Sequence, residues 1–186
     1  MALEGWIYNH IDEIKKKLRS MLPWKKEMKS EYIVNEFNNY GYNGVYNYLR
    51  NYLDLQSIRI NVEQLDSMME PGRCENRIMT QGGMKINSNY KIFINKAFSD
   101  DPFTSTAIFS HELCHVIYSE LIEGSSVINS ASQIDVERSV DLLVFLFNLG
   151  EFQLRVARDM RLSLGYFNQD NFERMIAIIQ KRGYSS

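Results

Sequence analysis

Three side chains within five residues have the types and the spacing for metal-dependent chemistry. His111, Glu112 and His115 form the pattern H-E-x-x-H. On an α-helix, residues four positions apart lie on the same face, so the two histidines can direct imidazole nitrogens at one metal ion. Glu112 lies about 100° around that helix, which suits contact with a water molecule better than metal ligation. Zinc lowers the pKa of such a water towards about 7, so the pattern predicts a hydrolytic zinc site.

The sequence around the motif favours the helix that this chemistry requires. Residues 99–102 offer side-chain acceptors for a helix N-terminus and a proline suited to the first turn. Apolar residues follow at helical spacing: Ile108, Leu113, Val116, Ile117 and Leu121. The alternative is that the two motif histidines only hydrogen-bond to the core or to water. The chain has three histidines, and two of them stand in this pattern, so we favour the metal site.

A catalytic zinc ion usually has three protein ligands, and no histidine follows His115. Glu137 is the best candidate, because it lies 137 − 115 = 22 residues downstream, in the first turns of a new predicted helix. Asp141 lies one turn further on the same face and can accept a hydrogen bond from a ligand histidine. The alternative is that both carboxylates pair with an arginine such as Arg138 or face water. The remaining candidate ligands are Glu120, Glu123 and Asp135.

The motif followed by Glu137-x-x-x-Asp141 resembles the gluzincin metallopeptidases. Together with the predicted strand at 90–95, it is similar in particular to the ImmA/IrrE-type peptidases, over about residues 76–149. The resemblance implies a minimal zincin-like fold, with zinc held by His111, His115 and Glu137. It also implies Glu112 as the catalytic base and Asp141 as a support for the ligands. Members of that family are associated with the cleavage of repressor or regulatory proteins.

We therefore predict a zinc-dependent peptidase that hydrolyses peptide bonds with Glu112 as general base. Its substrate is expected to be a peptide or a protein, with regulatory proteins as one class. The alternative is a zinc-binding regulatory or interaction protein that uses the zincin fold without turnover. The sequence does not define the group that stabilises the oxyanion; the candidates are Tyr166, Arg155 and Arg158.

Composition limits the partners and the compartment. With 21 basic and 23 acidic residues the net charge is −2, so we expect no nucleic-acid binding. No secretory signal is visible at residues 1–8, and the longest apolar stretch, residues 140–149, is too short for a bilayer, so we expect a cytoplasmic protein without a transmembrane segment. Cys74 and Cys114 are expected to be free thiols. The predicted helix at 5–22 carries basic residues, which we interpret as a solvated face of a packed helix rather than as a membrane anchor.

The expected fold is α+β, mostly helical, with a small antiparallel or mixed sheet beside the motif helix. We expect a single domain, 1–186, made of a helical part at 1–53, a zincin core at 54–150 and C-terminal helices at 151–186. Besides the motif helix, helices are expected at 5–22, 30–38, 44–52, 133–149, 151–164 and 170–182, with Gly150 closing the helix at 133–149. Strands are expected at 57–62, 76–80 and 90–95, with a turn at 81–83. An edge strand of this sheet can pair with an extended peptide.

Overall fold

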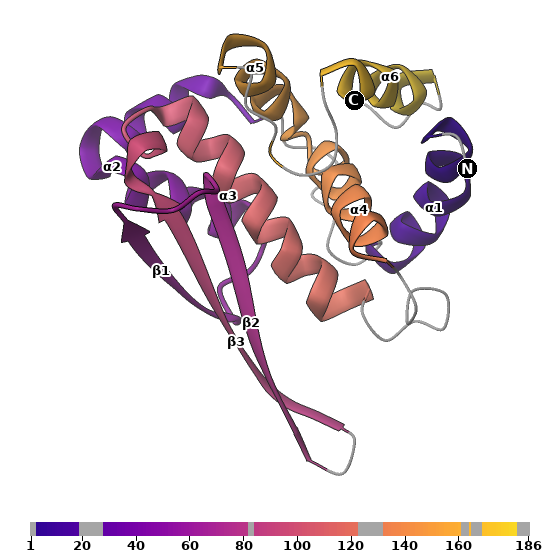
Figure 1. The fold of residues 1–186 in the computed structure, drawn as a ribbon, viewed down its shortest axis with the longest axis horizontal. Helices are drawn as coiled ribbons and strands as arrows, with labels where there is room; N and C mark the ends of the chain where they lie inside the picture. Colours follow the sequence, from indigo (N-terminus) through magenta and orange to yellow (C-terminus); the bar gives the residue numbers. More distant parts are fainter. Residues whose placement is uncertain are drawn as a thin grey trace.

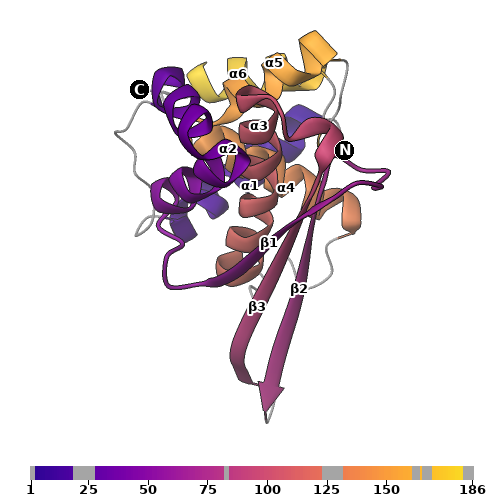
Figure 2. The ribbon, with the colours of Figure 1, turned by 90° about the vertical axis from the view of Figure 1, so that its left-hand side faces the viewer.

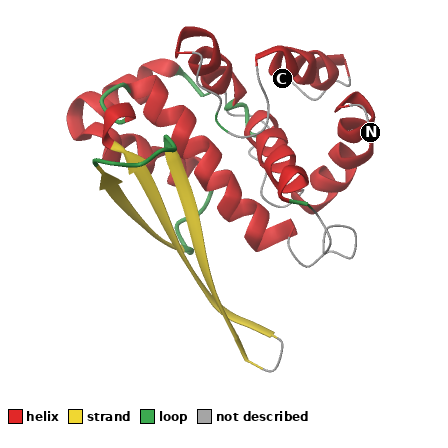
Figure 3. Cartoon of the chain, in the orientation of Figure 1, coloured by secondary structure: helices red, strands yellow, loops and turns green. Residues whose placement is uncertain are grey.

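The structure is a computed structural model that describes residues 3–18, 28–81, 84–122, 132–160, 164 and 169–181. It is mostly helical with one small sheet of three strands, which confirms the expected α+β class (Figure 3). The strands are β1 (Arg59–Leu65), β2 (Gly72–Gln81) and β3 (Met84–Asn95). The helices are α1 (Leu3–Leu18), α2 (Ser30–Tyr52), α3 (Pro102–Ile117), α4 (Gln133–Leu146), α5 (Gly150–Met160) and α6 (Gln169–Lys181), with the 3-10 turn η1 (Lys96–Phe98) and the π-helical turn η2 (Tyr118–Ile122).

The motif helix α3 lies at the centre of the fold, between the sheet and the helix α4 (Figure 1). Asp101 caps its N-terminus by accepting a hydrogen bond from the backbone nitrogen of Thr104 at 2.7 Å, and Pro102 occupies the first turn, as the sequence predicts. Every residue from Thr104 to Cys114 is buried. Because α2, α4, α5 and β2 all pack against this helix, the motif side chains of His111 and Glu112 are buried, whereas that of His115 is partly exposed.

The sheet has the strand order β1-β3-β2, with β1 parallel and β2 antiparallel to β3. The buried residues of β3 include Tyr90, Ile92 and Ile94, which lie within the strand predicted at 90–95. Both β2 and β3 are longer than predicted. The strand β3 begins at Met84 and pairs with β2 alone before the start of β1, whereas β2 begins at Gly72, opposite residues of β3 that also pair with β1. The residues of β2 and β3 that pair only with each other form a two-stranded ribbon that projects from the helices (Figures 1 and 2).

The end of α4 corrects the sequence prediction. The helix ends at Leu146, and Asn148 takes the left-handed conformation with φ 59°, which asparagine tolerates better than most residues. Gly150 does not close this helix but is the first residue of α5. A Cβ atom at Gly150 would lie 2.2 Å from the ring of Phe145. The glycine is therefore needed for the close approach of two helices and not for a left-handed turn.

The predicted interruption between residues 38 and 44 is confirmed but is narrower than expected. A single residue of α2, Gly41, has non-helical angles (φ 62°, ψ −153°), and helix continues on both sides of this kink. The first helix is described from Leu3 to Leu18. Residues 19–22 of its predicted span lie outside the described residues, as do Gly82 and Gly83 of the predicted turn.

One hydrophobic cluster includes buried residues from all six helices, and α1 packs against α6. The hydroxyl of Tyr52 at the end of α2 donates to the carbonyl of Phe147 at 2.9 Å, which joins two segments 95 residues apart. These contacts link the predicted N-terminal and C-terminal parts to the core, while the single-domain assignment stays a prediction. Among the described residues, no helix has the length and apolar character that a membrane crossing requires.

Candidate metal centre

His111, His115 and Glu137 lie together as a group that can hold a metal ion, each offering one ligand atom within 4.8 Å of the others. The two Nε2 atoms of the histidines are 3.2 Å apart. Oε2 of Glu137 lies 3.3 Å from Nε2 of His111 and 3.6 Å from Nε2 of His115. Ligand atoms at zinc–ligand distances in a tetrahedral site are separated by about 3.3–3.6 Å. The donor types and their spacing therefore fit one small cation.

Two helices bring these donors together. On α3 the two histidines lie one turn apart on the face that meets α4, with their rings nearly perpendicular at a centroid distance of 4.8 Å. Glu137 projects from the second turn of α4, whose start is fixed by Ser132 accepting a hydrogen bond from the backbone of Asp135. The sequence prediction of this helix start and of Glu137 beside the histidines agrees with the structure.

Asp141 lies one turn beyond Glu137 and is completely buried. Its Oδ1 is 3.3 Å from Nδ1 of His111, the nitrogen that faces away from the candidate ligand group. This is the arrangement in which a carboxylate fixes the tautomer and the orientation of a ligand histidine. The predicted supporting role of Asp141 is therefore compatible with its position.

The carboxylates of Glu137 and Asp141 favour a positive charge at the candidate ligand group. Burial alone would lower the pKa of His111, but the carboxylates of Asp141 and Glu137, each 3.3 Å from one of its ring nitrogens, outweigh burial and raise the pKa to about 10. Burial would raise the pKa of Glu137, yet the two histidines hold it well below its usual range. The same charges that hold a proton at His111 can hold a metal ion in its place.

Glu112 projects from α3, is buried against the beginning of β2, and is not one of the three candidate ligands. Its side chain accepts a hydrogen bond from the backbone N–H of Cys74. Burial raises the pKa of Glu112, and the nearby charges of His111 and His115 oppose that rise. This carboxylate is thus held beside the ligand group by the edge of the sheet.

A glycine makes room for Glu112. A Cβ atom at Gly72, the first residue of β2, would lie 2.9 Å from Oε1 of Glu112 and 2.5 Å from Cγ2 of Ile108. Sequence reasoning missed Gly72 and the amide of Cys74, because only the strand pairing shows which residues face the motif helix. The available signal was the spacing of residues 72, 74 and 76, which share one face of a strand.

The other candidate ligands have other roles. Glu120 accepts a hydrogen bond of 2.6 Å from the hydroxyl of Tyr90, and Asp135 belongs to the cap of α4. Arg138 forms an ion pair with Asp135 at 3.8 Å. Glu123 lies outside the described residues.

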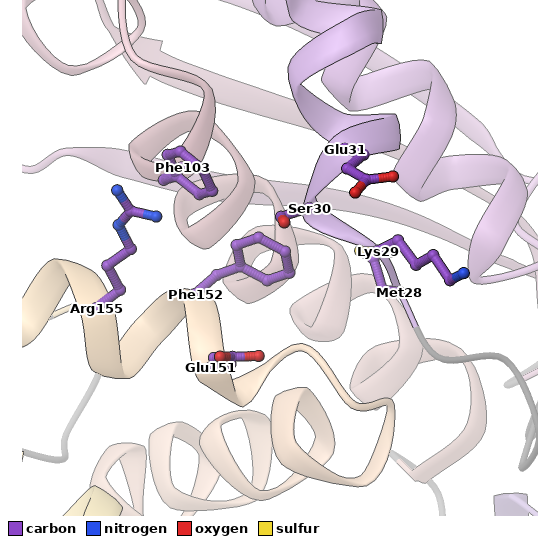
Figure 4. A pocket seen from close by; sticks show the side chains of 8 residues that line it. All are labelled: Met28, Lys29, Ser30, Glu31, Phe103, Glu151, Phe152 and Arg155. Carbon is purple, nitrogen blue, oxygen red and sulfur yellow. The ribbon is translucent and has the colours of Figure 1, made fainter.

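The two oxyanion-stabilising candidates that the structure describes, Arg155 and Arg158, are not members of the candidate ligand group. Arg155 on α5 lies over the ring of Phe103, 3.6 Å from its centroid, at the opposite end of α3 from His115, and Arg158 is exposed on the same helix. Figure 4 shows Arg155 at a separate cavity of about 470 Å³, formed where α2, α3 and α5 begin. Tyr166 lies outside the described residues. The oxyanion-stabilising group is therefore not identified among the described candidates.

No protein-family model, curated protein or solved structure matches this chain. The resemblance to gluzincins therefore stays a prediction based on the motif residues. Cys74 and Cys114 are both free in the structure, as expected, and burial raises the pKa of each thiol. Neither cysteine belongs to the candidate ligand group.

Proposed function

We propose that the protein is a zinc-dependent peptidase of the gluzincin type. The observation that carries this proposal is the separation of 3.2, 3.3 and 3.6 Å among two imidazole nitrogens and one carboxylate oxygen, with Glu112 buried beside them. Two histidines and one carboxylate form the usual three-ligand set of a catalytic zinc site, in which the fourth position stays open. A purely structural zinc site usually has four protein ligands and needs no additional base.

The chemistry divides between the metal and Glu112. Bound zinc supplies Lewis acidity, which polarises a carbonyl group and makes a water molecule acidic near neutral pH. The carboxylate of Glu112 takes a proton from the attacking water and delivers it to the leaving amine. Burial, which raises the pKa of Glu112, brings its two protonation states closer in free energy at neutral pH and so suits both halves of this transfer. His111, held by Asp141, and His115 keep their nitrogens directed at the metal position.

An extended peptide suits this site as a substrate. The strand β2 is at one edge of the sheet and faces α3, and the amide of Cys74 on this strand contacts Glu112. A peptide that adds to this edge as a further strand brings its backbone past the catalytic carboxylate. By resemblance to the ImmA/IrrE-type peptidases, we propose a regulatory protein as the natural source of such a segment.

The test combines metal analysis with hydrolysis of unfolded casein. We expect one zinc ion per chain in the wild type and loss of zinc in Glu137→Ala, whereas Glu151→Ala, an exposed carboxylate on α5, retains it. Glu112→Gln is expected to retain zinc and to lose hydrolysis by a factor of 100 or more, since general acid–base catalysis contributes about 10²–10⁴. Full hydrolysis by Glu112→Gln with zinc bound would contradict the mechanism.

The alternative, a zinc-binding interaction protein, gives a different result in the same experiment. Zinc would bind stoichiometrically and depend on Glu137, but neither the wild type nor Glu112→Gln would cleave the peptide substrate. Absence of zinc from the wild type after incubation with excess metal would contradict both functions.

A further inference from the structure

A cavity of about 190 Å³ adjoins the candidate metal centre. One of its walls is the ligand His115, and another is Val136, the residue directly before the ligand Glu137. The strand β2 contributes Cys74, whose backbone contacts Glu112. A group that enters this cavity therefore lies next to both the metal position and the proposed catalytic base.

Two hydrogen bonds join the walls of the cavity. The side-chain amide of Asn76 on β2 donates to the hydroxyl of Ser119 at 3.1 Å. The hydroxyl of Tyr90 on β3 donates to the carboxylate of Glu120 at 2.6 Å. These two bonds connect the sheet to the turn η2. The rest of its lining is the thiol of Cys74 and the side chains of Val136 and Tyr118.

The volume of the cavity suits a side chain of medium or large size. An engineered protein cavity of about 150 Å³ binds benzene, so about 190 Å³ accommodates a leucine or phenylalanine side chain. A glycine or alanine would leave most of this space unfilled and would forfeit the free energy of burying apolar surface.

The charges around the cavity disfavour an ionised side chain. In the part of the chain that the structure describes, no lysine or arginine lines it, and the carboxylates of Glu112, Glu120 and Glu137 lie beside residues of its lining. An acidic side chain would be repelled and would have no cation to pair with. A basic side chain would lose its hydration and would have to take Glu120 from Tyr90.

From these observations we propose that this cavity is the specificity pocket of the peptidase and that it receives an uncharged side chain of leucine or phenylalanine size from a residue flanking the scissile bond. This inference rests on the proposed function, because it assigns the pocket to the substrate of the same metal centre. Cys74, Tyr118 and Val136 are then residues that determine specificity and take no part in the proton transfer.

The pocket can be tested by binding, without turnover. The probes are the hydroxamates of leucine, phenylalanine, glycine, aspartate and lysine, which chelate zinc and differ only in the side chain. For the zinc-loaded wild type, calorimetry should give dissociation constants for the leucine and phenylalanine compounds about tenfold or more below those of the other three, since apolar burial supplies the difference. Equal dissociation constants, or a preference for aspartate or lysine, would overturn the pocket assignment.

Filling the pocket should remove this preference. Cys74→Phe places a ring in the cavity from β2, and Val136→Phe does so from α4; each should reduce the advantage of the leucine hydroxamate over the glycine hydroxamate to less than threefold. The matched control is Arg73→Phe, which adds the same ring on the other face of β2, where Arg73 is half exposed and lies over the ring of Phe93. This control should keep the wild-type preference. If a folded, zinc-loaded pocket variant also keeps it, the cavity is not the binding site.

The same samples separate failure of the pocket from failure of the peptidase proposal. Zinc uptake with the expected hydroxamate preference but without cleavage of casein would retain the pocket and contradict the peptidase. Cleavage that depends on Glu112 but shows no preference among the hydroxamates would retain the peptidase and contradict the pocket. Failure to bind zinc would contradict both.

Discussion

The carboxylate of Glu112 lies against the first residue of β2, and this contact is possible because that residue is a glycine without a side chain. Gly72 provides the space, and the next residue but one along the strand, Cys74, provides an amide hydrogen bond. The position of a proposed catalytic group is therefore set by the backbone of a strand that starts 40 residues earlier (112 − 72 = 40). A substitution at Gly72 should therefore affect the chemistry through Glu112.

We predict that Gly72→Ala lowers peptide hydrolysis at least tenfold while zinc content is unchanged. The new methyl group would overlap with Oε1 of Glu112 and with Ile108, so the carboxylate must move away from its place beside the ligands. Such overpacking also costs about 1–3 kcal/mol of stability. Assays of zinc content and hydrolysis on the same preparation test this, with the exposed Glu75→Ala as control; undiminished hydrolysis by Gly72→Ala would refute the role of this contact.

A second prediction at this scale concerns Asp141. Asp141→Asn preserves the shape of the side chain but removes the negative charge 3.3 Å from Nδ1 of His111. Removing a carboxylate that supports a ligand histidine weakens metal affinity by about 10–100-fold, and we expect about tenfold here because the amide oxygen still accepts a hydrogen bond. Competition with a zinc-binding dye measures the effect. Unchanged affinity would mean that Asp141 does not support His111.

Single residues also show how much of the site the sequence can predict. The two histidines and Glu137 follow from helical periodicity and from the ligand count of zinc, and the structure brings these three together. Gly72 and Cys74 could not be predicted, because no motif marks them and their role depends on the placement of β2 beside α3. The pairing of Glu120 with Tyr90 likewise follows from a tertiary contact 30 residues apart in sequence.

At the scale of whole elements, the sequence predicts where helices and strands occur better than how they end. The approximate positions of the helices and strands follow from the spacing of apolar residues along the sequence, which differs between helices and strands. Gly150 was expected to end α4, but Asn148 has the left-handed conformation and Gly150 is required by the ring of Phe145. A glycine suits both a helix end and a close contact, and only the neighbouring element distinguishes these uses.

The contact between α2 and the end of α4 gives a prediction about pH. Tyr52 donates a hydrogen bond to the carbonyl of Phe147, and its pKa is raised to about 12, chiefly by burial. The unfolded chain releases this proton from about pH 10, so the contribution of Tyr52 to stability is complete below pH 10 and declines as the pH rises towards 12. Tyr52→Phe should lower the free energy of unfolding by about 1 kcal/mol at pH 8 and make its decline above pH 10 less steep.

Urea unfolding at pH 8, 10 and 11 measures both effects. The control is Tyr40→Phe, because the side chain of Tyr40 is 69% exposed and should contribute little. A loss of stability that is the same for both variants, or a slope above pH 10 that Tyr52→Phe leaves unchanged, would contradict the role of this hydrogen bond.

For the molecule as a whole, the candidate metal centre joins α3, the most enclosed helix, to α4. A ligand that binds only the folded chain raises the free energy of unfolding, by about 2.7 kcal/mol at a concentration 100 times its dissociation constant. We therefore expect zinc to raise the melting temperature of the wild type and a chelator to reverse this. Glu137→Ala should show little response and Glu151→Ala a full one. Equal stabilisation of both variants would place the zinc elsewhere.

The sheet has a consequence for the internal motions of the protein. Residues 89–95 of β3 have partner strands on both sides, whereas residues 84–88 pair with β2 alone. Opening the ribbon breaks one ladder, but opening the other half of β3 also requires separation from β1 and from the buried side chains beneath it. Backbone amides should therefore exchange with deuterium much faster before Asn89 than after it. The single strand β3 is thus expected to have two kinetic zones, and the slow zone is the one that lies beside the motif helix.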